Sequence, residues 1–313
     1  MIDTLIYNFP GAKIDFLAGK RTAELIFDYP NINKVHTIEK DSINTIKKLV
    51  KDENYDLAII VHPVFSIALG LYLAGINYRL GTAYRWYSFL FNIKHHQHRR
   101  DSVKHEMEYN LDLLNELNCH KINDIKPGIK VCKNDEDHVR TKLKSLGLTS
   151  KDFIVIHIPS LGSAKVWSDR NFIDLINRVL NDKELDFDII LTGTNRDSVQ
   201  VKSITERIIP NSRVFAVLDI NLKQLAALLK LSALFVGNSS GPIHLAAAVD
   251  TFVVGLYSPV KEQSEIRWGP YTDKKKIFVP DSNKEAEDVM NNITPEEVFN
   301  FVKSFMLNNK NKF

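Results

Sequence analysis

Short apolar runs alternate along the chain with segments in which apolar residues recur every three or four positions. A continuous run such as 153–158 or 234–236 is typical of a strand that is covered on both faces. The spacing of Met107, Leu111 and Leu114 is typical of a helix with one apolar face. Strands that alternate with helices favour parallel pairing through crossover helices, so the pattern predicts an α/β fold.

The predicted elements fall into two α/β series separated by a polar stretch. A turn that leads into a strand is predicted at 10–17, and further strands at 34–38, 55–61, 76–80, 153–158, 187–191 and 213–217. Helices are predicted at 20–27, 42–50, 65–74, 104–117, 136–146, 171–180, 196–209 and 222–231, and from Pro295 onward with Thr294 as the cap. Residues 118–137 are polar, with Lys126-Pro-Gly in the middle. We therefore predict one domain at 1–133 and a second at 134–313.

Composition narrows the class of protein. At 313 residues, the chain is long enough for two domains with a hydrophobic core each, and its 44% hydrophobic and 25% charged residues are typical of a globular protein. No apolar run approaches the roughly 18 residues of a membrane span. Two cysteines, Cys119 and Cys132, predict neither a disulfide framework nor a zinc site, so a cytoplasmic location is expected. A net charge of +3 gives no reason to expect nucleic-acid binding.

Positive charge is concentrated in one segment, residues 79–105, where Asp101 is the single acidic residue. Its basic residues are Arg79, Arg85, Lys94, Arg99, Arg100 and Lys104. Such a cluster attracts an anionic substrate or a phospholipid surface, so peripheral contact with the inner membrane is a second expectation. The histidines at 95, 96 and 98 suggest a metal, but zinc ligands sit on shaped elements, and we favour an anion-contacting or solvated loop.

Residues 234–256 predict a buried strand, a tight turn, a helix and a second buried strand. Ser239, Ser240 and Gly241 are turn and N-cap residues, and Pro242 suits the first helical position. A helix that begins here directs free backbone N–H groups and its positive dipole end beyond the strand, which favours an anion. The glycine leaves room for a phosphate, and His244 adds a donor one turn later. The alternative is an ordinary strand–helix junction.

A second polar loop follows the strand at 153–158. Ser160 supplies a donor and Lys165 a mobile positive charge, at the strand end where open α/β sheets bind ligands. A solvated loop is the alternative for this segment alone, but together with residues 239–244 a phosphate site is the better interpretation. Asp197, after the next strand, is a candidate acceptor for a ribose hydroxyl or, alternatively, a partner of the helix dipole.

Several motifs resemble one known family. In the second half they are Ser160…Lys165-Val-Trp, Asn238-Ser-Ser-Gly-Pro-Ile-His-Leu-Ala-Ala-Ala and Gly255-Leu-Tyr-Ser-Pro; in the first half they are the segments at 10–15, 62–63, 74–81 and 105–114. Together they resemble glycosyltransferase family 9, the heptosyltransferases of lipopolysaccharide core assembly. The resemblance covers nearly the whole chain, and Gly-Pro-Ile-His-Leu at 241–245 is its most specific part.

The resemblance implies a GT-B fold, in which two Rossmann-like domains face a cleft. The second domain would hold a nucleotide-sugar donor, usually ADP-heptose, and the first the acceptor, with no metal or other cofactor required. Residues expected at the donor by motif position are Ser160, Lys165, Ser239, Ser240, Gly241 and His244, with Lys165 stabilising the leaving diphosphate of an inverting transfer. Arg79, Arg85, Arg99 and Arg100 would orient an anionic glycolipid acceptor. Asn238 stands where the family often has Asp, and Ser258-Pro-Val replaces the more usual Gly-Pro-Thr. These two differences leave the identity of the donor open.

The start of the chain departs from the family. Members open with a strand and a Gly-Asp loop whose Asp is the expected general base, whereas nine residues precede Pro10-Gly11 here and Asp3 falls in the helix after that loop. We therefore expect this strand and base to be absent from the chain. Loss of a central strand would leave its neighbours with unpaired edges. A nucleotide-sugar-binding remnant without transferase activity, and a nucleotide-sugar epimerase, are the alternative functions.

Overall fold

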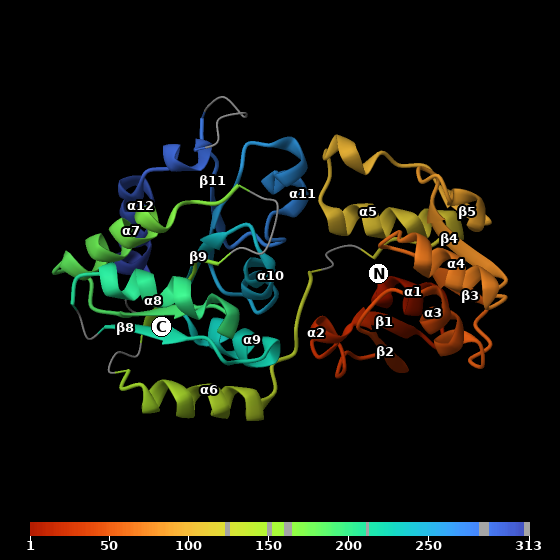
Figure 1. Cartoon of the computed structure of the whole chain (residues 1–313), viewed down its shortest axis with the longest axis horizontal. Coiled ribbons are helices and arrows are strands. Elements are labelled where there is room, and N and C mark those ends of the chain that lie inside the picture. Colours follow the sequence, from red (N-terminus) through yellow and green to blue (C-terminus); the bar gives the residue numbers. More distant parts are fainter. Residues whose placement is uncertain (123–125, 149–151, 160–164, 211–212, 282–287, 310–313) are drawn as a thin grey trace. The chain divides into compact units, whose positions relative to one another are not determined.

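The structure is a computed structural model that describes residues 1–122, 126–148, 152–159, 165–210, 213–281 and 288–309 (Figure 1). The chain forms two compact units, Met1–Ile125 and Lys126–Phe313. The division lies before the predicted boundary between residues 133 and 134. A backbone hydrogen bond from Ile129 N–H to the carbonyl of Ala248 attaches the intervening segment to the second unit.

The first unit alternates short strands with helices, as the apolar pattern predicts. Its elements, with η for a 3-10 helix, are α1 (Ile2–Asn8), β1 (Asp15–Gly19), α2 (Lys20–Ala23), β2 (Lys34–Ile38), α3 (Ile43–Val50), β3 (Leu57–Ile59), α4 (Phe65–Leu73), β4 (Tyr78–Thr82), η1 (Ser88–Leu90), β5 (Ile93–His95), η2 (Arg99–Asp101), α5 (Glu106–Asp112) and η3 (Leu113–Leu117). The helix predicted at 104–117 is thus divided between α5 and η3, and Asp3 lies in a helix as expected.

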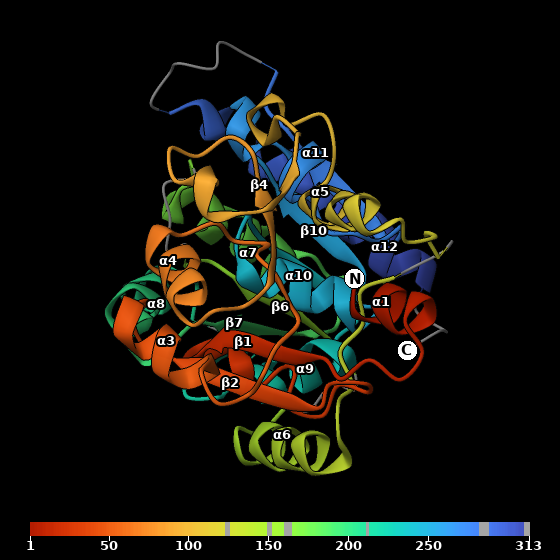
Figure 2. The same ribbon diagram turned by 90° about the vertical axis from the view of Figure 1, so that its right-hand side faces the viewer.

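The strands of the first unit form two separate sheets. β1 pairs with β2, and β4 lies between β3 and β5, with every pair parallel. Among the described residues no ladder joins the two sheets, and Figure 2 shows β1 and β2 apart from β4. β1 and β3 each keep one edge without a strand partner, and their residues are mostly half-buried.

Packing of α3 on α4 builds the core of the first unit. Gly70 allows the two helices to approach closely, because a Cβ at this position would lie 2.7 Å from the Cβ of Ile46. Ile46 is fully buried, and Ala68 and Leu71 of α4 are buried beside it. Within the described ranges, no helix is both long enough and apolar enough to cross a membrane.

The second unit continues the alternation with longer helices. Its elements are α6 (Lys133–Ser145), β6 (Phe153–His157), α7 (Asp169–Asn181), β7 (Asp188–Thr192), η4 (Asn195–Asp197), α8 (Ser198–Arg207), β8 (Val214–Val217), α9 (Leu222–Leu231), β9 (Leu234–Asn238), α10 (Gly241–Ala248), β10 (Val253–Leu256), η5 (Lys261–Gln263), α11 (Glu265–Trp268), β11 (Lys275–Phe278), η6 (Val289–Asn292) and α12 (Pro295–Asn309).

A single parallel sheet with strand order β11-β10-β9-β6-β7-β8 forms the centre of this unit. β6, β7, β9 and β10 are buried along their whole length, as expected of strands covered on both faces. α7 packs against α12, while α9 packs against α6 and α10. The strand order runs outward from β6 in one direction and from β9 in the other. The second unit is therefore a doubly wound sheet that reverses between β6 and β9.

Candidate functional site

The reversal between β6 and β9 places a site at the carboxyl ends of these two strands. In open α/β sheets, ligands bind in the crevice at such a switch point. His157 of β6 lies opposite Gly237 of β9, and a Cβ on Gly237 would come within 3.0 Å of the carbonyl oxygen of His157. The glycine therefore permits the close approach of the two strand ends.

Asn238, the last residue of β9, fixes the polar loop that follows β6. Its Oδ1 accepts a hydrogen bond of 2.9 Å from the backbone N–H of Trp167, and its Nδ2 donates to the carbonyl of Ile158 over 3.3 Å. The Trp167 indole is almost fully buried and donates to the carbonyl of Ile293 over 2.7 Å. The two loops of the predicted phosphate site thus meet at one sheet edge. This structural role of Asn238 was not predicted.

The amino end of α10 has the features of an anion site. Ser240 is the N-cap residue in an extended conformation, and Pro242 occupies the first turn. The Ser240 hydroxyl makes no capping hydrogen bond, and its Oγ is buried without a partner in the described structure. A Cβ on Gly241 would meet no atom within 4 Å, so open space lies over the helix end. Backbone N–H groups at such an end favour negative charge.

Lys165 is held at the same edge. Its backbone N–H donates to Oε1 of Gln263 over 3.1 Å, which links the loop after β6 to η5, beyond β10. Gln263 was not predicted, because nothing local marks a partner so distant in the sequence. The Ser239 hydroxyl hydrogen-bonds Tyr257, whose pKa is raised by burial although this bond acts in the opposite direction. His244 lies in the first turn of α10.

Five predicted donor-site residues therefore lie on loops or a helix end that converge at the switch point: Lys165, Ser239, Ser240, Gly241 and His244. Ser160 lies outside the described residues. Asp197 follows β7 and belongs to a capping box, in which its Oδ2 accepts from the backbone N–H and the hydroxyl of Thr194, both over 2.7 Å. Its contact with a ribose stays a prediction.

A buried histidine supports the floor of this site. His157 is 7% exposed, and its Nδ1 lies 3.0 Å from the Thr192 hydroxyl at the end of β7. Burial lowers the pKa of His157 to about 4, although the charge of Asp197 acts in the opposite direction. The imidazole is therefore neutral at pH 7 and serves as a hydrogen-bonding group of the sheet.

A cavity of about 580 Å³ lies at the opposite edge of the same sheet. Its lining includes Asp152, Ala233 and Phe252, which precede β6, β9 and β10. Ligands of open α/β sheets bind at the carboxyl ends of strands, so we do not assign the donor to this cavity.

The four arginines predicted for the acceptor differ in their surroundings. Arg79 donates to the carbonyls of Ile76 and Leu90, and Arg99 donates to Glu106, to Asn110 and to the carbonyl of Val61. Both side chains thus hold backbone segments in place. Arg85 and Arg100 are exposed and face solvent. Their contact with an acceptor stays a prediction.

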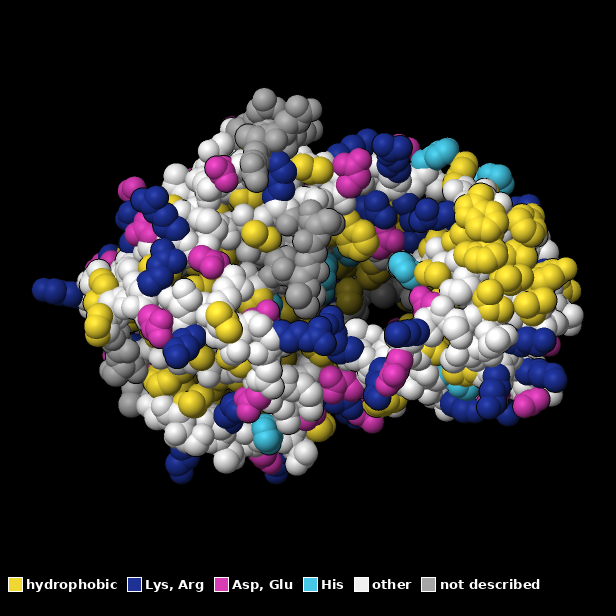
Figure 3. All heavy atoms as spheres, viewed as in Figure 1, with side chains coloured by type: hydrophobic (Ala, Val, Ile, Leu, Met, Phe, Trp, Pro, Cys, Tyr) yellow, Lys and Arg dark blue, Asp and Glu magenta, His cyan; other side chains and the backbone are white. Residues whose placement is uncertain are grey.

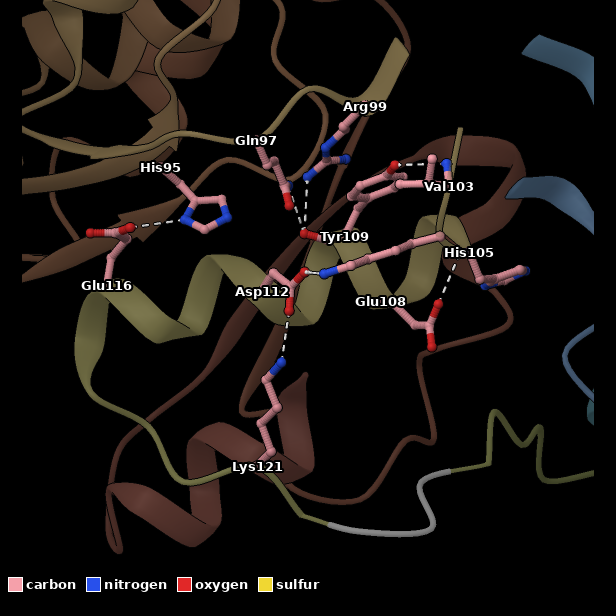
Figure 4. Close-up of polar contacts among 11 residues, drawn as sticks. His95, Gln97, Arg99, Val103, His105, Glu108, Tyr109, Asp112, Glu116 and Lys121 are labelled. Atoms are coloured by element: carbon pink, nitrogen blue, oxygen red, sulfur yellow. Dashed lines mark hydrogen bonds and ion pairs between the residues drawn. The ribbon is translucent and has the colours of Figure 1, made fainter. Parts of the chain in front are cut away.

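The first unit instead contains a polar pocket of about 490 Å³ between β5 and α5, which we call the α5 pocket (Figure 4). Lys104 and Lys121 donate to the two oxygens of Asp112, over 2.8 and 2.7 Å. Partial burial raises the pKa of Asp112, but the two lysines outweigh it and hold the pKa below its usual value. Asp101 also lines the pocket, so two ammonium groups and two carboxylates face it. Lys121 and Asp112 were not predicted, since they lie outside the basic segment.

Polar groups at the back of the α5 pocket complete its lining. His95 Nδ1 lies 2.8 Å from a carboxylate oxygen of Glu116, and Gln97 Nε2 donates to the carbonyl of Tyr109. Gln97 Oε1 is buried without a partner in the described structure. His96 and His98 also line the pocket, and each of their rings contacts the ring of Tyr84. Within the described ranges, no group of three or more His, Cys, Asp or Glu is placed to hold a metal ion.

The chain has two α/β units, and the second is a doubly wound sheet whose switch point is where proteins of this class bind their ligands. Residues 43–296 match the model of glycosyltransferase family 9 (heptosyltransferase), and the chain belongs to this family. A Haemophilus influenzae protein, provisionally assigned as a glycosyltransferase, is 30% identical over 292 residues, which are 89% of this chain and 83% of that protein. Lipopolysaccharide heptosyltransferase 3 of Escherichia coli K12 is 25% identical over 288 residues, 87% of this chain and 80% of the relative.

The fold is likewise that of a solved GT-B heptosyltransferase. The structure of E. coli ADP-heptose lipopolysaccharide heptosyltransferase II matches with a TM-score of 0.80 at 19% identity, over 99% of this chain and 94% of that one. The predicted family and fold class are confirmed, and family membership supports a sugar transferase.

Proposed function

We propose that the chain transfers a heptose from ADP-heptose to a lipopolysaccharide-core-type glycolipid in the cytoplasm, with inversion and without a required metal ion. Family membership supports sugar transfer, and the names of the relatives supply the donor and acceptor classes. The observation that carries the proposal is the amino end of α10, where the buried Ser240 hydroxyl has no partner in the described structure and space is open over Gly241.

In the proposed reaction, an acceptor hydroxyl oxygen forms a bond to the anomeric carbon on the face opposite the diphosphate. The bond from that carbon to the diphosphate oxygen breaks, and its electron pair leaves with ADP. The hydroxyl proton passes to a base. Lys165 and the N–H groups at the start of α10 stabilise the charge that grows on the leaving diphosphate, where fixed donors contribute most. These groups supply the positive charge that a metal ion supplies in other transferases.

We assign the acceptor to the first unit. The α5 pocket suits a sugar of the acceptor, because the ammonium groups of Lys104 and Lys121 donate hydrogen bonds to sugar oxygens and the carboxylates of Asp101 and Asp112 accept from sugar hydroxyls. The buried Oε1 of Gln97 adds an acceptor for a sugar hydroxyl.

The test separates binding from transfer. Calorimetric titration with ADP should show binding, and ADP-heptose should release ADP when the acceptor is present, with EDTA having no effect. Lys165→Ala should lower turnover by about 10²- to 10³-fold, because a fixed cation at the leaving group is removed. The melting temperature should stay unchanged. Lys183→Ala, at an exposed site after α7, is the matched control. Unchanged turnover of Lys165→Ala would remove this residue from the mechanism.

A nucleotide-sugar-binding protein without transferase activity is the second candidate. The divided sheet of the first unit favours it, because a base that acts on the acceptor is expected at the carboxyl end of a central strand. ADP binding without release of ADP from ADP-heptose, over a range of acceptors, would support this candidate over transfer.

A further inference from the structure

α4 is an apolar helix with an exposed face. Its nine residues, Phe-Ser-Ile-Ala-Leu-Gly-Leu-Tyr-Leu, include no charged side chain. A helix that is apolar on all sides is normally buried in a core or in a membrane. Yet Tyr72 is 49% exposed and Leu73 is 47% exposed.

Neighbouring aromatic residues extend this face. Trp86 is 73% exposed and Phe89 is 69% exposed, and η1, which contains Phe89, packs against α4. The Trp86 ring lies 4.7 Å from the ring of Phe65, between centroids. Figure 3 shows hydrophobic side chains gathered over α4. We call Phe65, Tyr72, Leu73, Trp86 and Phe89 the aromatic patch. Contiguous exposed patches of this kind mark protein or membrane interaction sites.

The segment that carries the aromatic patch has charges of one sign. No Asp or Glu occurs from residue 57 to residue 100. Arg85 and Lys94 are exposed, and no carboxylate of the described part of the chain pairs with either. The Arg79 guanidinium lies 5.2 Å from the centroid of the Tyr72 ring. Arg79 thus lies against the patch, and Arg85 is the chain neighbour of Trp86, so these two cations favour a negatively charged partner.

We propose that the aromatic patch docks onto the surface of an anionic phospholipid bilayer. Trp and Tyr rings are favoured at the level of the headgroups, and each nearby Arg or Lys adds attraction to anionic lipid. A second copy of the chain fits less well, because a two-fold contact joins the same surface of both copies and would bring the cations of one copy close to those of the other with no carboxylate from residues 57–100 between them. The proposal does not rest on the proposed function, since it involves neither the donor nor the acceptor.

The first test measures sedimentation of the full chain with vesicles, without nucleotide. Binding is expected to vesicles that contain phosphatidylglycerol, to weaken with salt, and to be at least tenfold weaker with phosphatidylcholine alone. Arg85→Gln and Lys94→Gln should each weaken binding about fivefold, and the double variant Trp86→Ser/Phe89→Ser by about tenfold or more. Val199→Ser, 80% exposed on α8, and Lys48→Gln, exposed on α3, are matched controls that should bind like the unaltered chain.

The second test reports the position of one side chain. Lipids brominated on their acyl chains should quench Trp86 on binding, because Trp167 is only 1% exposed and Trp268 is half-buried. Trp86→Phe should abolish the quenching while vesicle binding remains. This variant also covers the case in which Trp86→Ser/Phe89→Ser does not fold.

Three results would overturn the proposal. One is equal binding to neutral and anionic vesicles. Another is full quenching of the tryptophan fluorescence by brominated lipids when the vesicle-bound protein is the Trp86→Phe variant. The third is a dimer of the unaltered chain, seen by analytical ultracentrifugation, that Trp86→Ser/Phe89→Ser dissociates while no vesicles bind; the patch would then be a self-association surface.

Discussion

The backbone N–H of Trp167 donates to the side chain of Asn238 over 2.9 Å, and the same side chain donates to the carbonyl of Ile158. One buried amide therefore joins the end of β9 to two points on the chain that follows β6. A carboxylate could accept from Trp167 but could not donate to Ile158. The Asn at this position, where an Asp was expected from the family resemblance, thus has a structural reason.

Replacing this amide should affect both stability and ligand affinity. Asn238→Ala leaves the buried Trp167 N–H and the Ile158 carbonyl without this partner, so the free energy of unfolding should fall by about 1–3 kcal/mol. ADP affinity should fall as well, because Lys165 lies two residues before the lost contact. Urea denaturation and calorimetry measure the two effects. Asn44→Ala, exposed on α3, is the control; an ADP affinity equal to that of the unaltered chain would contradict the proposed role of this loop.

Comparing two buried serine hydroxyls tests whether an unpartnered hydroxyl belongs to a ligand site. Ser240 Oγ and Ser264 Oγ are both buried without a partner in the described structure. Removing either hydroxyl should leave the unfolding free energy of the ligand-free chain unchanged or raise it by about 1 kcal/mol, because the variant no longer buries a polar group without a hydrogen-bond partner.

The two alanine variants should differ in their affinity for ADP. Ser240→Ala is expected to weaken ADP binding about fivefold, whereas Ser264→Ala is expected to leave it unchanged. Melting temperature and calorimetry provide the measurements. Equal ADP affinity for both variants would place Ser240 outside the phosphate site.

The buried His157 makes stability depend on pH. Its pKa is lowered to about 4 in the folded chain and is about 6.5 when unfolded, so the unfolded state binds more protons between these values. Stability is therefore complete above pH 6.5 and is lost as the pH falls. Between pH 7.5 and 5 the loss from this group is roughly 2 kcal/mol. Urea denaturation of His157→Gln should show a correspondingly smaller dependence; an unchanged dependence would show that His157 is not responsible.

If the α5 pocket binds the acceptor, a substitution in its lining should weaken acceptor binding and leave the rate of the chemical step nearly unchanged. Lys121→Gln removes a cation that faces the acceptor but not the leaving group. The KM for acceptor should rise about tenfold with kcat nearly unchanged. Steady-state kinetics at saturating donor gives both constants, and Lys48→Gln is the control. A fall in kcat without a change in KM would exclude the pocket as an acceptor site.

Local signals in the sequence were sufficient for most elements of the second unit. α9 has the predicted bounds because Asn221 and Gln224 form a reciprocal capping box at its start. α12 begins as predicted, since Thr294 precedes it and its hydroxyl accepts from the N–H of Glu297. Both caps depend only on residues within one turn.

Two strands were missed because their composition is polar. β5 (Ile93–His95) lies in the basic segment, and β11 (Lys275–Phe278) begins with two lysines. Each pairs with one strand only, at the edge of its sheet, where an exposed strand needs little apolar character. Pairing partners distant in the sequence determine such strands.

The helix start at the proposed donor site was predictable, whereas the α5 pocket was not. Ser240, Gly241 and Pro242 form a helix start that the sequence shows directly. By contrast, Lys104 and Lys121 meet only because both donate to Asp112 of α5. Two lysines that are distant in the sequence and bind the same carboxylate leave no recognisable pattern in the local sequence.

Each unit has a core of its own, and the core of the second is far more extensive. The divided sheet leaves β1 and β3 half-buried, while the central strands of the second unit are wholly enclosed. Heating should consequently melt the molecule in two calorimetric steps, with the amino-terminal half first. A nucleotide that protects only the later step would assign it to the carboxyl-terminal half, and a protease added between the two transitions should leave that half intact.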